Sequence, residues 1–486
     1  MAITQKALLD SVPTGLLIGG QWRNASGGER FDVHDPSSGA TLTSCADGTP
    51  EDGLAALAAA EEAQPSWAAT PPRERSEILR RAFETVVERA DEFATLMSLE
   101  MGKTVAEARG EVTYGAEFFR WFAEEAVRIH GRYSVAPAGG SRLLTMKQPV
   151  GPTLMITPWN FPLAMGTRKI GPAVAAGCTM VVKPAHETPL TMLLLAEVMQ
   201  ESGLPDGVLN IVTTSHSGAV CEPLIRDPRL RKLTFTGSTA VGKVLVEQSA
   251  EQLLRLSMEL GGNAPFLVFE DADVDAAVDG AMLAKMRNIG EACTAANRFF
   301  AHESVAEEFS SKLAERMGAL VVGKGTKKGV DVGPLITAKA RDGVHELVQD
   351  AVAKGASVLT GGSPIAGRGY FYEPTVLTDV AADSRCLTEE IFGPVAPVCT
   401  FTDDADAIAK ANGTEFGLVG YLYSRDHARV LRVAEAMEFG MIGVNTGIVS
   451  NPSAPFGGVK QSGFGREGGF EGIEEYLETK YVGLAL

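Results

Sequence analysis

The sequence predicts an α/β fold in which a parallel sheet is covered by helices on both faces. Short apolar runs alternate with stretches of helical periodicity, and strands that are buried on both faces read as such runs. The alternation begins again nearer the carboxyl end, which predicts a second α/β domain. The runs of the first sheet are at 153–156, 179–182, 209–212 and 233–235, and the later repeats fill 351–443.

A chain of this size needs more than one hydrophobic core. It has 486 residues, of which 45% are hydrophobic, and single cores stop growing at roughly 250–300 residues. An apolar run at 266–269 leads into a helical pattern over about 275–288, and we place the second domain from there onward. Farther along, Ser304 and Glu307 have the spacing of a capping box, which predicts a helix that runs toward Leu320.

The segments outside the sheets are also patterned. Glycine pairs separate short apolar runs near the N-terminus, which predicts small strands. Apolar residues keep a helical period from Pro72 to Met97, with Gly102 beyond the end, so one helix is expected there. A further helix is expected over 105–122.

Two segments that are distant in sequence are expected to be extended. Stretches at Arg132–Ala136 and Ser141–Gln148 read as a hairpin, and Glu475–Leu486 reads as another strand. Exposed strands of this kind pair with each other or with a neighbouring chain. Plain surface structure fits the same pattern.

Charge and cysteine usage exclude several classes of partner. The formal net charge is −17 at pH 7, with a pI near 5.0, and such a field repels nucleic acid and anionic membranes. No apolar stretch is long enough to span a bilayer, and the N-terminus has the pattern of neither a signal nor a transit peptide. Six cysteines lie far apart, with no C-x-x-C pair and no histidine at metal spacing. We therefore expect no metal site and a cytoplasmic location.

One stretch has reactive chemistry. The segment from Arg287 to Asn297 starts as a helical pattern, breaks at Gly290 and presents a thiol at Cys293. A thiol becomes a nucleophile when donors or positive charge favour the thiolate and the backbone leaves it accessible. Those partners must come from elsewhere in the chain.

Two other side chains have the chemistry that such a thiol needs. Asn160 follows the strand predicted to end near Ile156, where an amide either donates to a developing oxyanion or caps a turn. Glu259 lies in an apolar, glycine-rich setting, where a carboxylate is either a general base with a raised pKa or half of a structural ion pair. Each structural reading is the commoner one by itself. Together, however, the two groups join the thiol at strand ends.

A strand-to-helix turn has the pattern of an anion site. The segment from Thr234 to Gly242 ends a predicted strand and opens a helix, where backbone N–H groups and the helix dipole favour a phosphate. Glycine is also needed there for packing, so phosphate binding and plain packing stay equally open. Lys183, just past another strand, either binds ribose hydroxyls or is solvated.

Seven motifs in order resemble the aldehyde dehydrogenase superfamily over essentially the whole chain. They are Pro158-Trp-Asn-Phe-Pro162, Lys183-Pro-Ala-x-x-Thr-Pro189, Phe235-Thr-Gly-Ser-Thr239, Glu259-Leu-Gly-Gly262, Gly290-Glu-Ala-Cys293, Glu389-Glu-Ile-Phe-Gly-Pro394 and Pro455-Phe-Gly-Gly458. The resemblance implies a homodimer or homotetramer that acts on a small-molecule aldehyde. It also implies a Rossmann-type parallel-sheet cofactor domain (1–130 and 150–261), an α/β catalytic domain (262–461) and a small β oligomerisation element (131–149 and 462–486).

The same resemblance implies roles for the matching residues. Cys293 attacks the aldehyde carbon, while its own backbone N–H and the Asn160 amide hold the oxyanion. Glu259 activates the water that hydrolyses the resulting thioester. Glu467 matches a further acidic position without a definite role. The cofactor is NADP or NAD, and the residues that match its binding positions are Thr157, Trp159, Lys183, Gly237, Ser238, Glu390 and Phe392.

Two positions depart from the family pattern. Glu291 stands where the family usually has glutamine, at a position with no assigned chemistry. His186 replaces the carboxylate that binds the adenosine ribose in NAD-preferring members. Losing that charge removes the repulsion against a 2′-phosphate, so the sequence favours NADP.

The surroundings of Arg168 and Arg287 resemble the succinate-semialdehyde dehydrogenase branch, although such residues are more commonly surface cations. In that branch two arginines and a serine, matched here by Ser450, hold the distal carboxylate of the substrate. The expected reaction is NAD(P)+-dependent oxidation of succinic semialdehyde to succinate. Broader specificity for glutaric, amino- or aromatic aldehydes is the alternative, and a cofactor-independent thioesterase or esterase is a remoter one.

Overall fold

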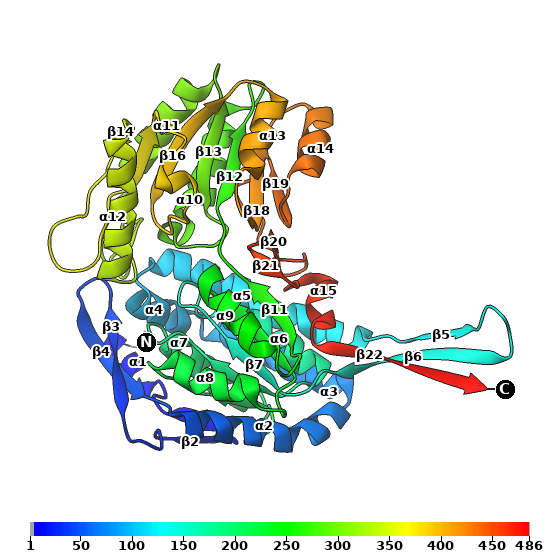
Figure 1. Cartoon of the computed structure of the whole chain (residues 1–486). Coiled ribbons are helices and arrows are strands. Elements are labelled where there is room, and N and C mark those ends of the chain that lie inside the picture. Colours follow the sequence, from blue (N-terminus) through cyan, green and yellow to red (C-terminus); the bar gives the residue numbers. More distant parts are fainter. Residues whose placement is uncertain (1–3, 486) are drawn as a thin grey trace.

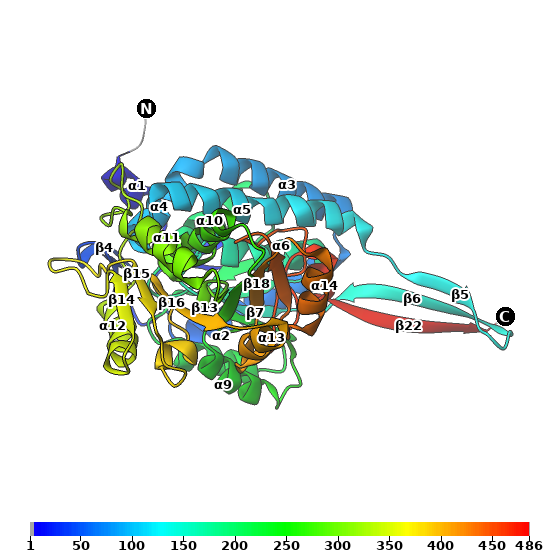
Figure 2. The same ribbon diagram turned by 90° about the horizontal axis from the view of Figure 1, so that it is seen from above.

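The computed structural model describes residues 4–485, which form two α/β lobes and a projecting arm. In Figure 1 the lobe built mainly from the first half of the chain lies below the other lobe, and Figure 2 shows the same arm extending well beyond both. The predicted α/β fold, with a parallel-sheet lobe, a second α/β lobe and a small β element, is confirmed.

The first sheet has eight strands in the order β2-β1-β9-β8-β7-β10-β11-β21. Strands β7 to β11 run parallel, and the edge strands β1, β2 and β21 pair antiparallel. The predicted apolar runs are β7 to β10, with no end shifted by more than one residue. The strands are β1 Leu16–Ile18, β2 Gln21–Arg23, β7 Thr153–Ile156, β8 Met180–Lys183, β9 Leu209–Ile211, β10 Lys232–Thr236, β11 Arg255–Glu259 and β21 Gly463–Phe464.

Alternate residues of these strands enter two hydrophobic cores, because successive side chains point to opposite faces of a sheet. Met155 and Val182 pack in the core shared with α3 to α7, whereas Leu154 and Val181 pack in the core shared with α2, α8 and α9. The helices of this lobe are α1 Gln5–Ser11, α2 Pro50–Ala69, α3 Pro72–Glu88, α4 Ala90–Glu100, α5 Val105–Glu125, α6 Ala164–Ala176, α7 Leu190–Glu201, α8 Ser217–Arg226, α9 Thr239–Ser249 and α15 Gly469–Glu474, and a 3₁₀ turn, η1 Ala126–Arg128, follows α5. The chain order reverses between β7 and β10, where ligands of such sheets bind at the carboxyl ends of the strands.

The second sheet has seven strands in the order β14-β15-β16-β13-β12-β18-β19, parallel except for β14. Its strands are β12 Ala264–Val268, β13 Ala296–His302, β14 Ser357–Thr360, β15 Thr375–Thr378, β16 Val395–Phe401, β18 Val419–Tyr423 and β19 Met441–Val444. Its helices are α10 Val274–Met286, α11 Ala306–Gly318, α12 Ala338–Ala353, α13 Asp404–Asn412 and α14 His427–Ala436, with 3₁₀ turns η2 Arg287–Gly290 and η3 Arg385–Leu387. Two small ribbons pair β3 Arg30–Asp35 with β4 Ala40–Ala46, and β17 Phe416–Gly417 with β20 Val459–Lys460.

The arm joins segments that are far apart in sequence. Strand β6 (Ser141–Pro149) lies between β5 (Arg132–Val135) and β22 (Leu477–Ala485), and both pairings are antiparallel. The predicted hairpin and the predicted C-terminal strand are therefore confirmed, and they pair with each other within one chain.

Two local predictions were wrong. The helix expected from Pro72 to Met97 is two helices, because the chain bends at Arg89, whose guanidinium pairs with Glu197 of α7 at 3.2 Å. Ser304 does not cap α11: its hydroxyl bonds to His302 Nδ1 at 2.8 Å, and Val305 is the residue before the helix. Within residues 4–485, no helix combines the length and the apolar character needed to cross a membrane.

Candidate active site

A cavity of about 270 Å³ lies beside the reversal point of the first sheet, and residues of both lobes line it. The loops after β7, β10 and β11 contribute one wall, and the turn after α10 contributes another. The predicted residues that line it are Trp159, Asn160, Arg168, Gly237, Ser238, Glu259, Arg287, Cys293, Glu390, Phe392 and Ser450. The fold therefore brings together side chains from seven separate stretches of sequence.

The turn that carries Cys293 is strained. Helix α10 ends at Met286, earlier than the break predicted at Gly290, and Asn288 and Ile289 have φ angles of 55° and 64°. Left-handed backbone is uncommon for residues other than glycine and persists only where surrounding contacts hold it. Glu107 supplies one such contact, because its Oε1 accepts the Asn288 backbone N–H at 2.7 Å.

Asn160 is held against this turn from both sides. Its Nδ2 donates to the Glu291 carbonyl at 3.0 Å, and its own backbone carbonyl accepts from Asn288 Nδ2 at 3.0 Å. An amide nitrogen carries two hydrogens. One is therefore used to fix the side chain, and the other is available to the cavity.

Electrostatics keep the Cys293 thiol protonated at neutral pH. Burial raises the pKa of Cys293 to about 12; the positive charge of Arg168 opposes this rise, while Glu390 and Glu259 add to it. Arg287 also lowers this pKa, by a smaller amount. The thiol is consequently a nucleophile only when a base removes its proton.

Glu259 ends β11 and is 2% exposed, and neither of its carboxylate oxygens has a hydrogen-bond partner among residues 4–485. Burial raises the pKa of Glu259 well above its usual value, and the nearby Glu467 raises it further. A raised pKa of this kind is a feature of carboxyl groups that act as general bases.

Glu467 differs from Glu259 in having partners. It forms buried ion pairs with Arg168 and Lys169. Burial pushes the pKa of Glu467 upward, yet the two cations hold it below its usual value. Glu467 is therefore ionised, and it keeps Arg168 at the cavity wall.

One end of the cavity is cationic and aromatic. Arg287 Nη1 donates to Ser450 Oγ at 3.0 Å, and the guanidinium lies over the rings of Phe161 and Tyr114 at 5.1 and 5.5 Å. The Arg168 guanidinium makes no hydrogen bond within residues 4–485 apart from its ion pair with Glu467. The two arginines thus offer free N–H groups to an anion.

The opposite end of the cavity has the features of a nucleotide site. Ser238 caps α9, and its Oγ accepts from Val241 N at 3.4 Å. A side chain does not fit at Gly237, since its Cβ would lie 2.4 Å from the Phe235 ring. Across the cavity, Glu390 accepts from Gly262 N at 3.1 Å, and burial raises its pKa to about 7.

Comparison with known proteins identifies the family. The model of the aldehyde dehydrogenase family matches residues 22–482. The chain belongs to the aldehyde dehydrogenase family. It is 62% identical over 444 residues to a succinate-semialdehyde dehydrogenase of Paenarthrobacter nicotinovorans, covering 91% of this chain and 99% of the relative. It is 49% identical to a glutarate-semialdehyde dehydrogenase of Pseudomonas aeruginosa, covering 96% of each. A solved structure of an NADP-dependent enzyme from E. coli superposes with a TM-score of 0.97 at 50% identity, covering 98% of each chain.

Three residues expected to bind the cofactor of this aldehyde dehydrogenase lie beside the cavity without lining it. The Thr157 backbone follows β7 and donates to the Lys183 carbonyl at 3.2 Å. Lys183 Nζ donates to Ser217 Oγ at 2.9 Å, next to the start of α8. His186 is half-exposed, with Nδ1 3.3 Å from Glu187. They share the carboxyl ends of β7 and β8.

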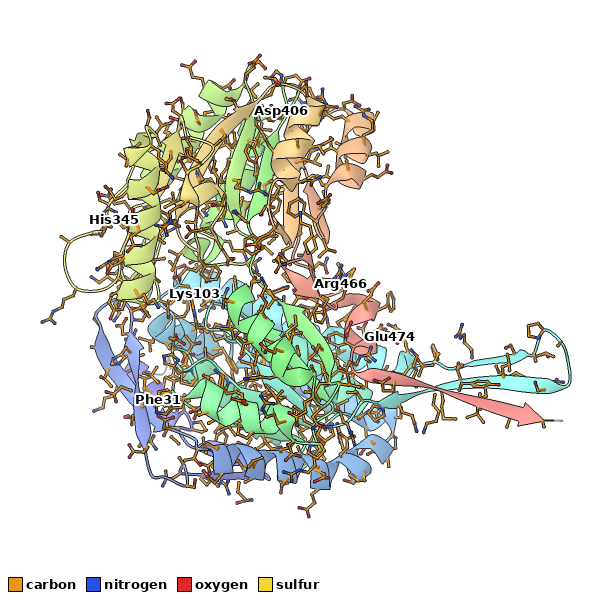
Figure 3. The ribbon with its side chains drawn as sticks, viewed as in Figure 1. Phe31, Lys103, His345, Asp406, Arg466 and Glu474 are labelled. Carbon is orange, nitrogen blue, oxygen red and sulfur yellow. The ribbon has the colours of Figure 1, made fainter. Side chains whose placement is uncertain are left out.

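Sequence reasoning missed the residues that support the aldehyde dehydrogenase site from behind. Lys103, labelled in Figure 3 near the junction of the lobes, is fully buried and donates to the Asn160 carbonyl at 2.8 Å. Tyr421 donates to the Thr294 carbonyl at 2.9 Å, beside Cys293. A lysine after a helix and a tyrosine in a strand give no such signal in sequence, because only the packing of the lobes places them here.

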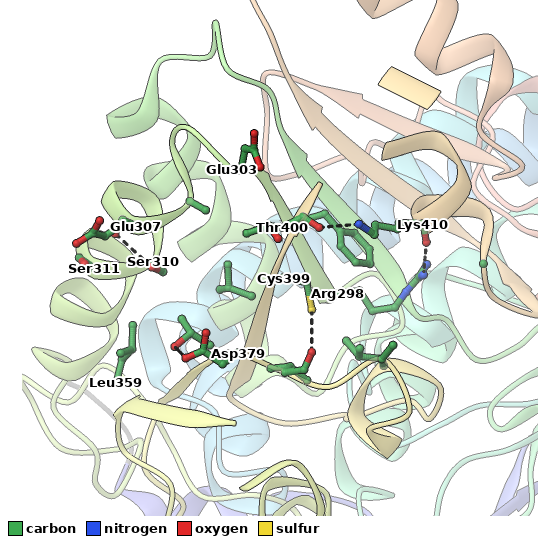
Figure 4. Close-up of a pocket in the computed structure, with 18 of the residues that line it drawn as sticks. Arg298, Glu303, Glu307, Ser310, Ser311, Leu359, Asp379, Cys399, Thr400 and Lys410 are labelled. Carbon is green, nitrogen blue, oxygen red and sulfur yellow. Dashed lines mark hydrogen bonds between the residues drawn. The ribbon is translucent and has the colours of Figure 1, made fainter. Parts of the chain in front are cut away.

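A larger hollow, of about 820 Å³, lies between α11, α13 and the second sheet (Figure 4). It holds Cys399 and Arg298, but the Arg298 guanidinium donates to the main-chain carbonyls of Asn263, Lys410 and Ala411. Lys410 Nζ in turn donates to the Thr400 carbonyl at 2.9 Å. The cationic groups of this hollow are thus occupied by the protein itself.

Proposed function

We propose that this chain oxidises succinic semialdehyde to succinate with NAD(P)+. The observation that carries the proposal is the hydrogen-bonded pair Arg287 and Ser450 in the same cavity as Cys293. A guanidinium in a closed cavity binds a carboxylate through strong charge-assisted hydrogen bonds, which a neutral aldehyde cannot form. The substrate therefore enters with its carboxylate at the arginines and its aldehyde at the thiol.

The chemistry begins with loss of the thiol proton. Glu259 takes this proton when it is ionised, and the Cys293 sulfur then forms a bond to the aldehyde carbon. The oxyanion accepts hydrogen bonds from the Cys293 backbone N–H and from the second hydrogen of Asn160 Nδ2. Glu259 passes this first proton to solvent and is ionised again. After hydride transfer the carbon is a thioester; Glu259 then accepts a proton from the water that hydrolyses it and returns that proton to the departing Cys293 sulfur. Succinate and the free thiol result.

The residues around Gly237 fit a dinucleotide. The N-terminus of α9 faces the cavity at Ser238, and the absence of a side chain at Gly237 lets the backbone approach a pyrophosphate. Glu390 and Lys183 lie where hydroxyls of the two riboses would accept or donate, and Trp159 meets Phe392 edge-on at 5.4 Å beside the cavity. When bound, the nicotinamide supplies the hydride acceptor.

NADP is the proposed preference over NAD. The position beside the adenosine ribose holds His186 rather than a carboxylate, and the buried ammonium of Lys183 lies beside Ser217. Although Glu187 lies 3.3 Å from His186 Nδ1, this set repels a 2′-phosphate less than one with a further carboxylate at position 186 would. The E. coli enzyme of 50% identity is described as NADP-dependent, which supports this choice.

Initial rates with a panel of aldehydes and both cofactors test the proposal. Succinic semialdehyde should give the highest kcat/KM, above glutaric semialdehyde and well above butyraldehyde, with a rise of absorbance at 340 nm. The relative of 49% identity is named for glutarate semialdehyde. A higher kcat/KM for glutaric semialdehyde would therefore make it the substrate in place of succinic semialdehyde, with the same mechanism. Hydrolysis of esters without any oxidation would contradict the dehydrogenase itself.

We further propose a homodimer or homotetramer built through the arm. The outer edge of β22 and the strand β5 are exposed, with Tyr133 and Tyr481 each more than 60% accessible. Open edges and exposed aromatic side chains are features of association surfaces. Deleting residues 477–486 should convert the oligomer to a monomer in light scattering; an unchanged mass would contradict the arm as the interface.

We propose that the two sheets belong to domains with different functions. We assign 1–130 and 150–261 to cofactor binding, 262–461 to catalysis, and 131–149 with 462–486 to association. We place the enzyme in the reducing cytoplasm, in keeping with six cysteines that are all free thiols.

A further inference from the structure

Glu291 is the residue at which the reactive turn meets the Asn160 amide. Its backbone carbonyl accepts from Asn160 Nδ2 at 3.0 Å and from Asn288 Nδ2 at 2.9 Å. One main-chain atom therefore fixes both the amide proposed to hold the oxyanion and the left-handed backbone before Cys293.

The side chain of Glu291 anchors this atom to the second lobe. Glu291 is 0% exposed, and its Oε1 accepts the Ile336 backbone N–H at 3.1 Å, just before α12. Its Oε2 has no hydrogen-bond partner among residues 4–485. A carboxylate in this place would leave one charged oxygen buried and uncompensated, which is costly, whereas a neutral carboxyl group is tolerated.

The charged groups that face Glu291 do not neutralise it. Lys103 is near enough to favour the carboxylate, but it already pairs with Glu111 at 2.5 Å. Glu107, on the same helix as Glu111, adds a second negative charge that faces Glu291. Burial raises the pKa of Glu291 well above its usual value, outweighing the Ile336 hydrogen bond and Lys103.

We propose that Glu291 is a positioning residue whose carboxyl group must remain protonated for the turn to hold Asn160 beside Cys293. The inference rests on the proposed dehydrogenase function, through the role given to Asn160. Ionisation places a second carboxylate beside Glu107 in a site closed to water, so the turn relaxes to admit water and the Glu291 carbonyl moves with it. Raising the pH through the pKa of Glu291 thereby releases Asn160 and lowers kcat reversibly. The glutamine that is usual in the family is neutral at every pH and lacks this response.

The test compares kcat as a function of pH in wild type, Glu291→Gln and Glu303→Gln. Glu303 is an exposed residue of the larger hollow, outside the site, and serves as the matched control. In wild type and in the control, kcat should fall about tenfold per pH unit once Glu291 ionises. The ratio of kcat at the high-pH end of the profile to kcat on its plateau should be at least about tenfold higher in Glu291→Gln. Superimposable profiles, or an equal loss at every pH, would overturn the proposal.

Thermal unfolding provides a readout that does not depend on activity. A carboxyl group whose folded pKa is raised contributes stability that is complete below the unfolded pKa of about 4.3 and is lost as pH rises to the folded value. The Tm of Glu291→Gln minus that of wild type should therefore increase with pH over this window. A Tm difference that stays constant with pH would contradict the proposal that Glu291 is protonated in the folded protein. If wild type oxidises no aldehyde, the proposed function fails, while the Tm difference still decides whether Glu291 is protonated.

Discussion

Two hollows of this chain hold the same kinds of side chain, but among residues 4–485 the buried polar groups without a hydrogen-bond partner line only the smaller one of the two. The hollow around Cys399 is about three times as large as the cavity around Cys293, at about 820 against 270 Å³. Burial raises the pKa of both thiols, to about 11 and about 12. The difference lies in what surrounds the sulfur.

Arg298, in the larger hollow, donates to three main-chain carbonyls. In the smaller cavity, within residues 4–485, Arg168 makes no hydrogen bond apart from its ion pair with Glu467, and Glu259 makes none. Buried polar groups without partners cost stability, so a fold retains them where they serve a ligand or a reaction. Hydrogen-bond satisfaction therefore distinguishes a reactive cavity from a packing hollow better than volume does.

The largest contrast is expected between the two thiols. Cys293→Ala should lower kcat by on the order of 10⁴-fold or more, because no other group forms the bond to the aldehyde carbon. Cys399→Ala should keep kcat within about twofold. Steady-state rates with succinic semialdehyde measure both. Activity that survives Cys293→Ala would break the comparison outright.

The next largest effect on kcat is expected at the carboxyl group of Glu259. Glu259→Gln should lower kcat by about 10²–10⁴-fold, the range typical of a lost general base. On the acid side, kcat of the wild type should rise with pH as Glu259 ionises. The same substitution should raise Tm at neutral pH, because a raised folded pKa costs stability as pH rises above the unfolded value. A Tm that falls instead would mean that Glu259 is structurally needed.

The two arginines should separate specificity from stability. Arg287→Ala should cost about 2–4 kcal/mol in kcat/KM for succinic semialdehyde and much less for butyraldehyde, since only the former has a carboxylate to bind. Arg298→Ala should instead lower Tm, because three buried carbonyls lose their donor. A preference for succinic semialdehyde that persists in Arg287→Ala would show that the carboxylate binds elsewhere.

The smallest effect is expected at the cofactor edge of the reactive cavity. His186→Glu should shift the ratio of kcat/KM for NADP to that for NAD by roughly tenfold toward NAD, since a carboxylate repels the 2′-phosphate across partly screened solvent. His186→Gln is the matched control, because it is neutral and should shift the ratio less. Equal ratios in wild type and His186→Glu would remove His186 from cofactor choice.

The sequence by itself determined the fold class and supplied the residues that we propose as the reactive groups. Apolar runs near 153 and 233 are typical of buried parallel strands, since both faces of such a strand must be apolar. Cys293, Glu259 and Asn160 were singled out because the ordered motifs around them resemble the aldehyde dehydrogenase superfamily; Asn160 and Glu259, taken alone, each had a commoner structural reading. The hairpin and the C-terminal strand were also readable from their patterns, although their pairing with each other was not.

Only the tertiary structure decided which groups are satisfied. Both Glu467 and Glu259 are glutamates near glycines. The sequence gives no means of telling that Glu467 pairs with the distant Lys169 while Glu259 has no hydrogen-bond partner among residues 4–485. It likewise missed the helix break near Arg89 and wrongly predicted a cap at Ser304, where long-range or local side-chain contacts override propensity. Burial and hydrogen bonding are properties of the packed chain, and they decide the chemistry of the groups that the sequence supplies.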